Sequence, residues 1–280
     1  MLMPSRRHRT TTTEVLSVPA NNSLRCDACS VLVEGLDLES FSDAYLAHAR
    51  SQHPEWPFTD MAIRNVAEAT QRLTGSTERL DTIGTVSIHR VSASRIPDWL
   101  SFFDHDAFAG NPLDACCYCA APHVIPRGRR GGMEQRPWRQ SRELMIGLLR
   151  AGRAFGYLVY VDDKPAGWVN ASKRSECAAH RLGEDASPPD GEVISLSCFG
   201  IASPYRGHGL VRLLLRRVLD DAPSRGALWV EAYPSTDQEN VDEDNWMGQA
   251  DLLAAHGFET VETVERQTVM RVRVDPSDHR

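Results

Sequence analysis

The stretch SPYRGHGLVRLLLRRVL, which spans Ser203–Leu219, decides the fold of this chain. Two glycines, an arginine and a histidine stand directly before an apolar segment with helical spacing. A helix N-terminus exposes unpaired backbone N–H groups and carries a partial positive charge. Glycines let this backbone approach an anion closely. The stretch therefore predicts a helix whose first turn holds phosphate, with Arg206 adding charge-assisted hydrogen bonds.

The neighbouring segments predict that this helix connects two buried strands. EVISLSCFGIA, at 192–202, is apolar at nearly every position, and ALWVEAYP follows the helix at 227–234. Such runs are typical of strands that are covered on both faces. Further strands are expected at 85–91, in a hairpin at 155–172 around the turn DDKP, and at 261–274. Strands and helices alternate, so the chain is predicted to be an α/β protein.

Helices are expected at 61–73, 94–108 and 248–258, and at 141–152 with Ser141 as N-cap. The segment Ala109–Trp138 shows no regular period, and its length suits a specialised acceptor pocket.

Composition excludes several classes of function. The 280 residues are 41% hydrophobic and 25% charged, as in soluble globular proteins. The net charge of −7 argues against a DNA-binding surface and against a large RNA-binding surface. No apolar run approaches the roughly 20 residues that span a bilayer, and Met1–Ala20 lacks the apolar core of a secretory signal. Seven cysteines, an odd number, then favour a reducing cytoplasm, with thiols or metal ligands rather than disulfides.

A separate N-terminal module carries a metal-ligand pattern. Cys26 and Cys29 are followed by His48 and His53, which gives Cys-x2-Cys-x18-His-x4-His. This spacing predicts a structural zinc ion, although the central spacer is longer than in DNA-binding fingers. The histidines are expected on a helix that starts at Ser40 and is capped with the help of Asp43. The module is too small to bury much core, so the metal would supply its folding energy.

The predicted domains are a disordered tail at 1–23, the zinc-finger-like module at 24–60, a helix and linker at 61–84, and the α/β domain at 85–280. A second cysteine cluster, Cys116, Cys117 and Cys119, is spaced too tightly for a regular tetrahedral site. Thiols that line a substrate pocket or pack in the core are the preferred interpretation there.

Three blocks in order carry a family resemblance. CFGIASPYRGHGL, ALWVEAYP and DLLAAHGFE together resemble the GNAT superfamily of acyl-CoA-dependent N-acyltransferases. Arg206 and Gly209 fit that family's Arg/Gln-x-x-Gly-x-Gly/Ala signature, and Gly257 and Phe258 fit its late GF pair. The resemblance covers about Thr85–Val274. It implies a mixed central sheet flanked by helices, and transfer of an acyl group from acyl-CoA, with acetyl-CoA the expected donor, to a small-molecule amine.

The resemblance also implies a donor site. The backbone of Phe199, Gly200 and Ile201 would pair with the pantetheine arm of coenzyme A like an added strand. The thioester would lie where the two buried strands separate. The pyrophosphate would be held by the N–H groups of the loop residues Arg206, Gly207, His208, Gly209 and Leu210.

Two positions depart from the family pattern. Val211 replaces the last small residue of the signature, and Leu253 replaces the tyrosine that often protonates the leaving thiolate. Glu231 interrupts an apolar strand where some relatives carry a catalytic glutamate. A buried carboxylate needs a role or a partner, so Glu231 is predicted to be the general base, and the alternative is a glutamate that is structurally paired or faces outward. Tyr233 is the substitute acid, and Cys198 is interpreted as a core residue.

Three functions follow from these patterns. The leading hypothesis is an N-acyltransferase that acts on a small amine in secondary metabolism or resistance. The first alternative keeps the fold but takes the acyl group from aminoacyl-tRNA or a carrier-protein thioester. The second is a non-catalytic module that senses acyl-CoA or binds a protein partner.

Overall fold

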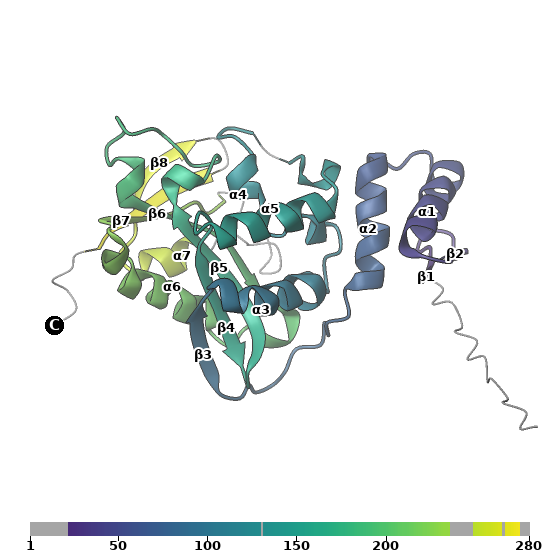
Figure 1. Ribbon diagram of the computed structural model, residues 1–280, viewed down its shortest axis with the longest axis horizontal. Coiled ribbons are helices and arrows are strands. Elements are labelled where there is room, and N and C mark those ends of the chain that lie inside the picture. Colours follow the sequence, from purple (N-terminus) through teal and green to yellow (C-terminus); the bar gives the residue numbers. More distant parts are fainter. Residues whose placement is uncertain (1–21, 130, 236–248, 265–266, 275–280) are drawn as a thin grey trace, which may run out of the picture.

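A seven-stranded mixed sheet forms the centre of the molecule in the computed structural model, which describes residues 22–129, 131–235, 249–264 and 267–274. The strand order is β3-β4-β5-β6-β7-β9-β8, and every pair is antiparallel except β6–β7. The expected α/β architecture is thereby confirmed (Figure 1). The strands are β3 (Val86–Arg90), β4 (Gly156–Val161), β5 (Lys164–Lys173), β6 (Val193–Ile201), β7 (Trp229–Ala232), β8 (Glu259–Val264) and β9 (Gln267–Arg273).

Helices cover both faces of this sheet. On β4 the Tyr157 hydroxyl donates to Asp221 of α6 at 2.7 Å, whereas Trp168 of β5 packs edge-on against Trp99 of α3. Because side chains alternate along strands, and Leu158 rather than Tyr157 pairs with Trp168, α6 and α3 lie on opposite faces. The helices of this domain are α3 (Ile96–Ser101), α4 (Ala121–Val124), α5 (Trp138–Arg150), α6 (Leu210–Asp221) and α7 (Ala250–Ala254).

Two predicted helix starts are wrong, for the same physical reason. Helix α5 begins at Trp138 after Pro137, so Ser141 lies buried inside the helix and does not cap it. Helix α1 (Leu38–Gln52) is capped by Asp37, whose carboxylate accepts the Ser40 N–H while the Ser40 hydroxyl accepts the Asp37 N–H. In both cases a residue three or four positions earlier in the chain, Asp37 or Pro137, occupies the N-cap position, so the helix begins before the predicted serine.

The N-terminal module has a small core of its own. Strands β1 (Asn22–Arg25) and β2 (Leu32–Gly35) pair, and helices α1 and α2 (Asp60–Arg72) pack beside them. The buried residues of this core are Val33, Phe41, Tyr45, Ala49, Ile63 and Ala67. The predicted tail at 1–23 lies outside the described residues except for its last two, which belong to β1.

Within the module, helix α2 lies on the side that faces the sheet domain, with α1 on its other side (Figure 1). Asn65, which is buried, donates to the carbonyls of Glu134 and Arg136, both at 2.9 Å, and accepts the Trp138 N–H at 3.2 Å. Arg72 donates to the carbonyls of Phe103, Asp104 and Ala115 at 3.1–3.2 Å. These partly buried bonds join side chains of α2 to backbone groups across the boundary, so α2 is fixed to the sheet domain.

The segment 109–138 is irregular, as expected, but it is ordered by short turns. It contains α4, two short 3-10 turns, and left-handed backbone at Tyr118 and Cys119. Tyr118 and Cys119 are fully buried in the main core. None of the helices in the described parts of the chain combines the length with the apolar composition that a membrane span requires.

Candidate functional site

The two central parallel strands separate after four residue pairs. Pairing runs from Val193–Trp229 to Leu196–Ala232 and extends no further among the described residues. On its other side β6 continues to pair with β5, as far as Ile201 opposite Gly167. The end of β6 therefore presents one edge of backbone N–H and C=O groups that β7 does not occupy. Such an edge can hydrogen-bond an extended ligand.

A bulge marks the start of this open edge. The register between β5 and β6 shifts where Trp168 faces Gly200 but Asn170 faces Ser197, and Cys198 adopts a φ of +59°. The additional residue in β6 bends the strand and redirects its side chains. A left-handed non-glycine residue is strained, and such strain is concentrated at functional sites.

The glycine loop follows directly from this edge. Gly207 and Gly209 have φ values of +85° and +74°, and Gly209 is the N-cap of α6 without a side-chain capping bond. A Cβ at either glycine would meet nothing within 4 Å, so backbone conformation rather than space requires glycine here. Among the described residues, the N–H groups of Gly207, His208 and Gly209 have no backbone acceptor. The loop thus offers free donors at the positive end of a helix.

Side chains around the loop fix its position. Arg206 Nε donates to the Ile201 carbonyl at 3.0 Å, which ties the loop to the end of β6. His208 Nε2 donates to the Leu80 carbonyl at 2.8 Å, and the Leu80 N–H donates to the Pro204 carbonyl at 3.0 Å. Val211 packs against the main core. The anion-binding roles of Arg206 to Leu210 stay predictions.

Glu231 lies in a buried charge network. Its Oε1 accepts from Arg174 Nη1 at 2.8 Å and from Arg271 Nε at 2.7 Å and Nη2 at 2.6 Å. Its Oε2 accepts from Arg174 Nη1 at 2.9 Å and from the Tyr233 hydroxyl at 2.9 Å. A carboxylate has about four lone-pair sites, and these contacts occupy them. Glu231 is therefore paired in the way that the structural alternative requires. Its role as general base stays a prediction.

The surroundings keep Tyr233 protonated. Burial raises the pKa of Tyr233 well above its ordinary value, and the Glu231 carboxylate acts in the same direction. His180 stacks on the Tyr233 ring with centroids 3.6 Å apart, and burial lowers the pKa of His180 to about 3, so this imidazole is neutral. Leu253, at the family's tyrosine position, is packed in the main core. The acid role of Tyr233 stays a prediction.

Sequence reasoning missed two residues beside this site. Arg174 is fully buried and joins Glu231 to Asp190, whose Oδ1 accepts from Arg174 Nε at 2.6 Å. Ser197 lies one residue beyond the last β6–β7 pair, and its buried hydroxyl has no partner in the described structure. The sequence did not indicate a role for Arg174, because its partner Glu231 is 57 residues away and no local pattern connects the two. Ser197 was missed because β6 contains two serines, Ser195 and Ser197, and the sequence does not distinguish them.

The four predicted metal ligands come together in the N-terminal module. Cys26 Sγ lies 3.3 Å from His53 Nε2, and Cys29 Sγ lies 3.3 Å from His48 Nε2. All four ligand atoms lie within 4.8 Å of one another. Ligand bonds of 2.0–2.3 Å around a tetrahedral zinc give comparable separations. Within the described part of the chain, this is the one His/Cys/Asp/Glu group with such geometry.

The second cysteine cluster has a different environment. Cys116, Cys117 and Cys119 line a cavity together with Cys198 of β6. The sulfur of Cys119 accepts from Trp168 Nε1 at 3.3 Å and from Asn170 Nδ2 at 3.5 Å. All seven cysteines lie within the described residues, and none of them forms a disulfide.

Comparison with known proteins adds family information. Residues 125–242 match the model of the acetyltransferase (GNAT) family. No curated protein matches the chain. The chain is similar to the PaiA N-acetyltransferase of Thermoplasma acidophilum in complex with coenzyme A, with 12% identity over 68% of this chain and 99% of that one and a TM-score of 0.42.

Two further solved structures give comparable values. The ribosomal-protein-S18-alanine N-acetyltransferase of Escherichia coli is 13% identical, over 70% of this chain and 97% of that one, with a TM-score of 0.39. The putative acetyltransferase YncA of Salmonella typhimurium with acetyl-CoA is 14% identical, over 69% and 96%, with a TM-score of 0.38. Over residues 125–242 the chain is thus similar to the acetyltransferase (GNAT) family, and this part contains the two parallel strands that separate within the mixed sheet.

Proposed function

We propose that this protein is an N-acyltransferase that moves an acyl group, acetyl in the first instance, from coenzyme A to the amine of a small molecule. The observation that carries the proposal is the open edge of β6, which leads directly to the glycine loop at the start of α6. The pantetheine arm would lie along Phe199–Ile201, and the pyrophosphate at the loop. The free thiols support a cytoplasmic location.

Catalysis then depends mostly on position. The acceptor's ammonium group first loses a proton to water, and the free amine nitrogen attacks the thioester carbonyl carbon. A C–N bond forms, the C–S bond breaks, the nitrogen loses a second proton, and the thiolate of coenzyme A takes up one. Holding the two reactants in line supplies most of the acceleration. In this chain the β6 edge orients the thioester and α6 fixes the phosphates. The Glu231 network joins β7 and β9 to the turn that directly follows β5.

The loop is tested by Gly209→Glu, which places an anion where the phosphates would bind. We expect coenzyme A affinity, measured by calorimetry, to fall ~100-fold or more, since like charges in contact cost several kcal/mol. Gly226→Glu is the matched control. Gly226 also has a positive φ, +72°, and open space where a Cβ would be, but it lies beyond the C-terminal end of α6, at the end of the turn Pro223–Arg225. Equal affinity in the two variants would place the donor elsewhere.

Glu231 is tested by Glu231→Gln. The amide cannot satisfy two arginines, so we expect unfolding to require about 3–5 kcal/mol less free energy, as when a buried pair is broken. We also expect transfer to slow by the same factor at every pH, with the exposed Glu259→Gln as control. A loss of ~10²–10⁴ at neutral pH that shrinks as pH rises would instead assign Glu231 as general base.

We further propose that Cys26, Cys29, His48 and His53 hold one zinc ion. The geometry of the four ligand atoms supports this. Protein side chains would fill all four positions, which is the arrangement of a structural site rather than a catalytic one. The module's core consists of only six buried residues, so zinc would supply folding free energy. Trp56 stacks on His53 with ring centroids 4.5 Å apart and shields one side of the cluster.

Elemental analysis of the purified protein tests the metal site. We expect about one zinc per chain in the parent protein and a loss of most of it in Cys29→Ser, because a hydroxyl replaces a thiolate ligand. Cys116→Ser, which alters a buried thiol outside the cluster, should keep the metal. A parent protein that stays without zinc after refolding with excess zinc would contradict the assignment.

A further inference from the structure

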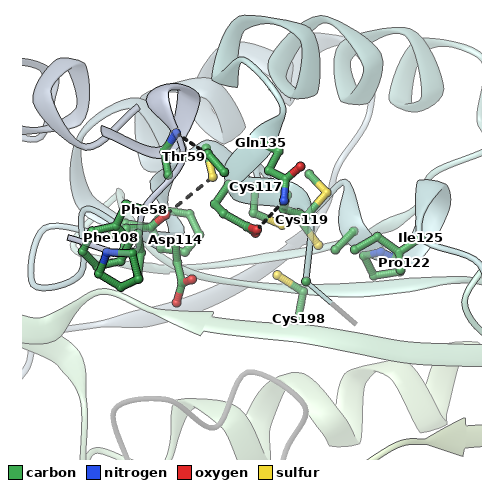
Figure 2. A pocket seen from close by; sticks show the side chains of 18 residues that line it. Phe58, Thr59, Phe108, Asp114, Cys117, Cys119, Pro122, Ile125, Gln135 and Cys198 are labelled. Atoms are coloured by element: carbon green, nitrogen blue, oxygen red, sulfur yellow. Dashed lines mark hydrogen bonds between the residues drawn. The ribbon is translucent and has the colours of Figure 1, made fainter. Parts of the chain in front are cut away.

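A cavity of about 660 Å³ lies between the N-terminal module and the sheet domain. Its wall is built from the start of α2, the segments 108–125 and 131–135, and Cys198 of β6. Figure 2 shows Phe58, Thr59 and Phe108 at one end, Pro122 and Ile125 at the other, and the cysteines between them. A cavity of this volume accommodates a molecule of drug-like size.

One part of the cavity wall lies beside the proposed reaction centre. Cys198 is the residue at the bulge, where the free edge of β6 begins. Figure 2 shows its side chain projecting from the strand toward Cys117 and Cys119. A molecule that fills the cavity therefore ends beside the place proposed for the thioester.

Most of the lining is apolar. The side chains that contribute hydrocarbon surface are Phe58, Phe108, Leu113, Pro122, Ile125 and Met133. The thiols add to this surface as neutral groups, because burial raises the pKa of Cys116 and of Cys117 to about 12. A ligand with a hydrocarbon or aromatic body is favoured over a strongly polar one.

The charged groups of the lining are both acidic. Asp114 and Glu134 line the cavity, and none of the described lining residues is lysine or arginine. The Asp114 Oδ2 accepts from Asn111 Nδ2 at 2.8 Å, which fixes the carboxylate. Figure 2 shows this carboxylate on the same side of the cavity as Cys198. A carboxylate on an apolar wall attracts a cationic group of the ligand, such as an ammonium group. It repels a carboxylate on the ligand.

We propose that this cavity binds the acceptor, and that the acceptor is an apolar primary amine whose ammonium group pairs with Asp114. The inference rests on the proposed function and adds the substrate class to it. It also gives the N-terminal module a role, because α2 forms one wall of the cavity and Asn65 and Arg72 hold that wall in place. An acyl chain is the competing occupant, but it would not need the carboxylates.

The test measures binding of amines without donor, by calorimetry. The probes are 2-phenylethylamine, its carboxylated counterpart phenylalanine, and ethanolamine, which lacks the apolar body. We expect 2-phenylethylamine to bind, and both other probes to bind at least ~10-fold more weakly. Asp114→Asn should weaken 2-phenylethylamine ~10- to 100-fold, since a charge-assisted bond is lost while the shape is kept. Glu143→Gln, which removes an exposed carboxylate outside the cavity, should have no effect.

A second variant tests the occupant. Leu113 is 40% exposed and lies in the lining, so Leu113→Trp narrows the cavity with little effect on the core. It should weaken 2-phenylethylamine and leave the affinities for acetyl-CoA and octanoyl-CoA unchanged. Selective loss of octanoyl-CoA would overturn the proposal and assign the cavity to the acyl chain. Normal coenzyme A binding with no response of amine binding to Asp114→Asn would overturn it too, while leaving the proposed function intact.

Discussion

The separation of β6 from β7 after Leu196 and Ala232 is the constraint on which the site depends. Parallel strands that stayed paired would use every backbone group of β6 within the sheet. Because they part, β6 keeps an open edge, and the chain leaves this edge into a glycine loop with unpaired N–H groups. The bulge at Cys198 and the contact of Arg206 with Ile201 set the direction of that edge and loop. One local divergence thus places an open strand edge and a loop of free N–H donors one after the other along the chain.

Local sequence patterns predicted the elements but not their partners. Apolar runs and glycines identified β6, α6 and β7, because burial and backbone freedom leave direct marks on composition. Helix starts were less accurate at Ser40 and Ser141, where Asp37 and Pro137 begin the helix instead. The spacing of cysteines and histidines predicted a cluster whose ligand atoms do meet.

Long-range pairing was not accessible from the sequence. The partners of Glu231 are 57 and 40 residues away, so a buried carboxylate was visible but its neutralising arginines were not. The same holds for α2, whose Asn65 reaches residues 69 to 73 positions further along the chain. A composite cavity with walls from α2, a long irregular segment and β6 has no linear signature. Its charge and volume emerge only when these segments fold together.

Amide hydrogen exchange with and without coenzyme A tests the central claim most directly. A donor that lies along β6 and ends at α6 should slow exchange in two segments, 198–201 and 206–211. Exchange in the N-terminal module, 22–53, should stay unchanged and serves as the internal reference. Slower exchange in both segments on binding is the predicted result. Binding of coenzyme A without added protection at either segment would contradict the account.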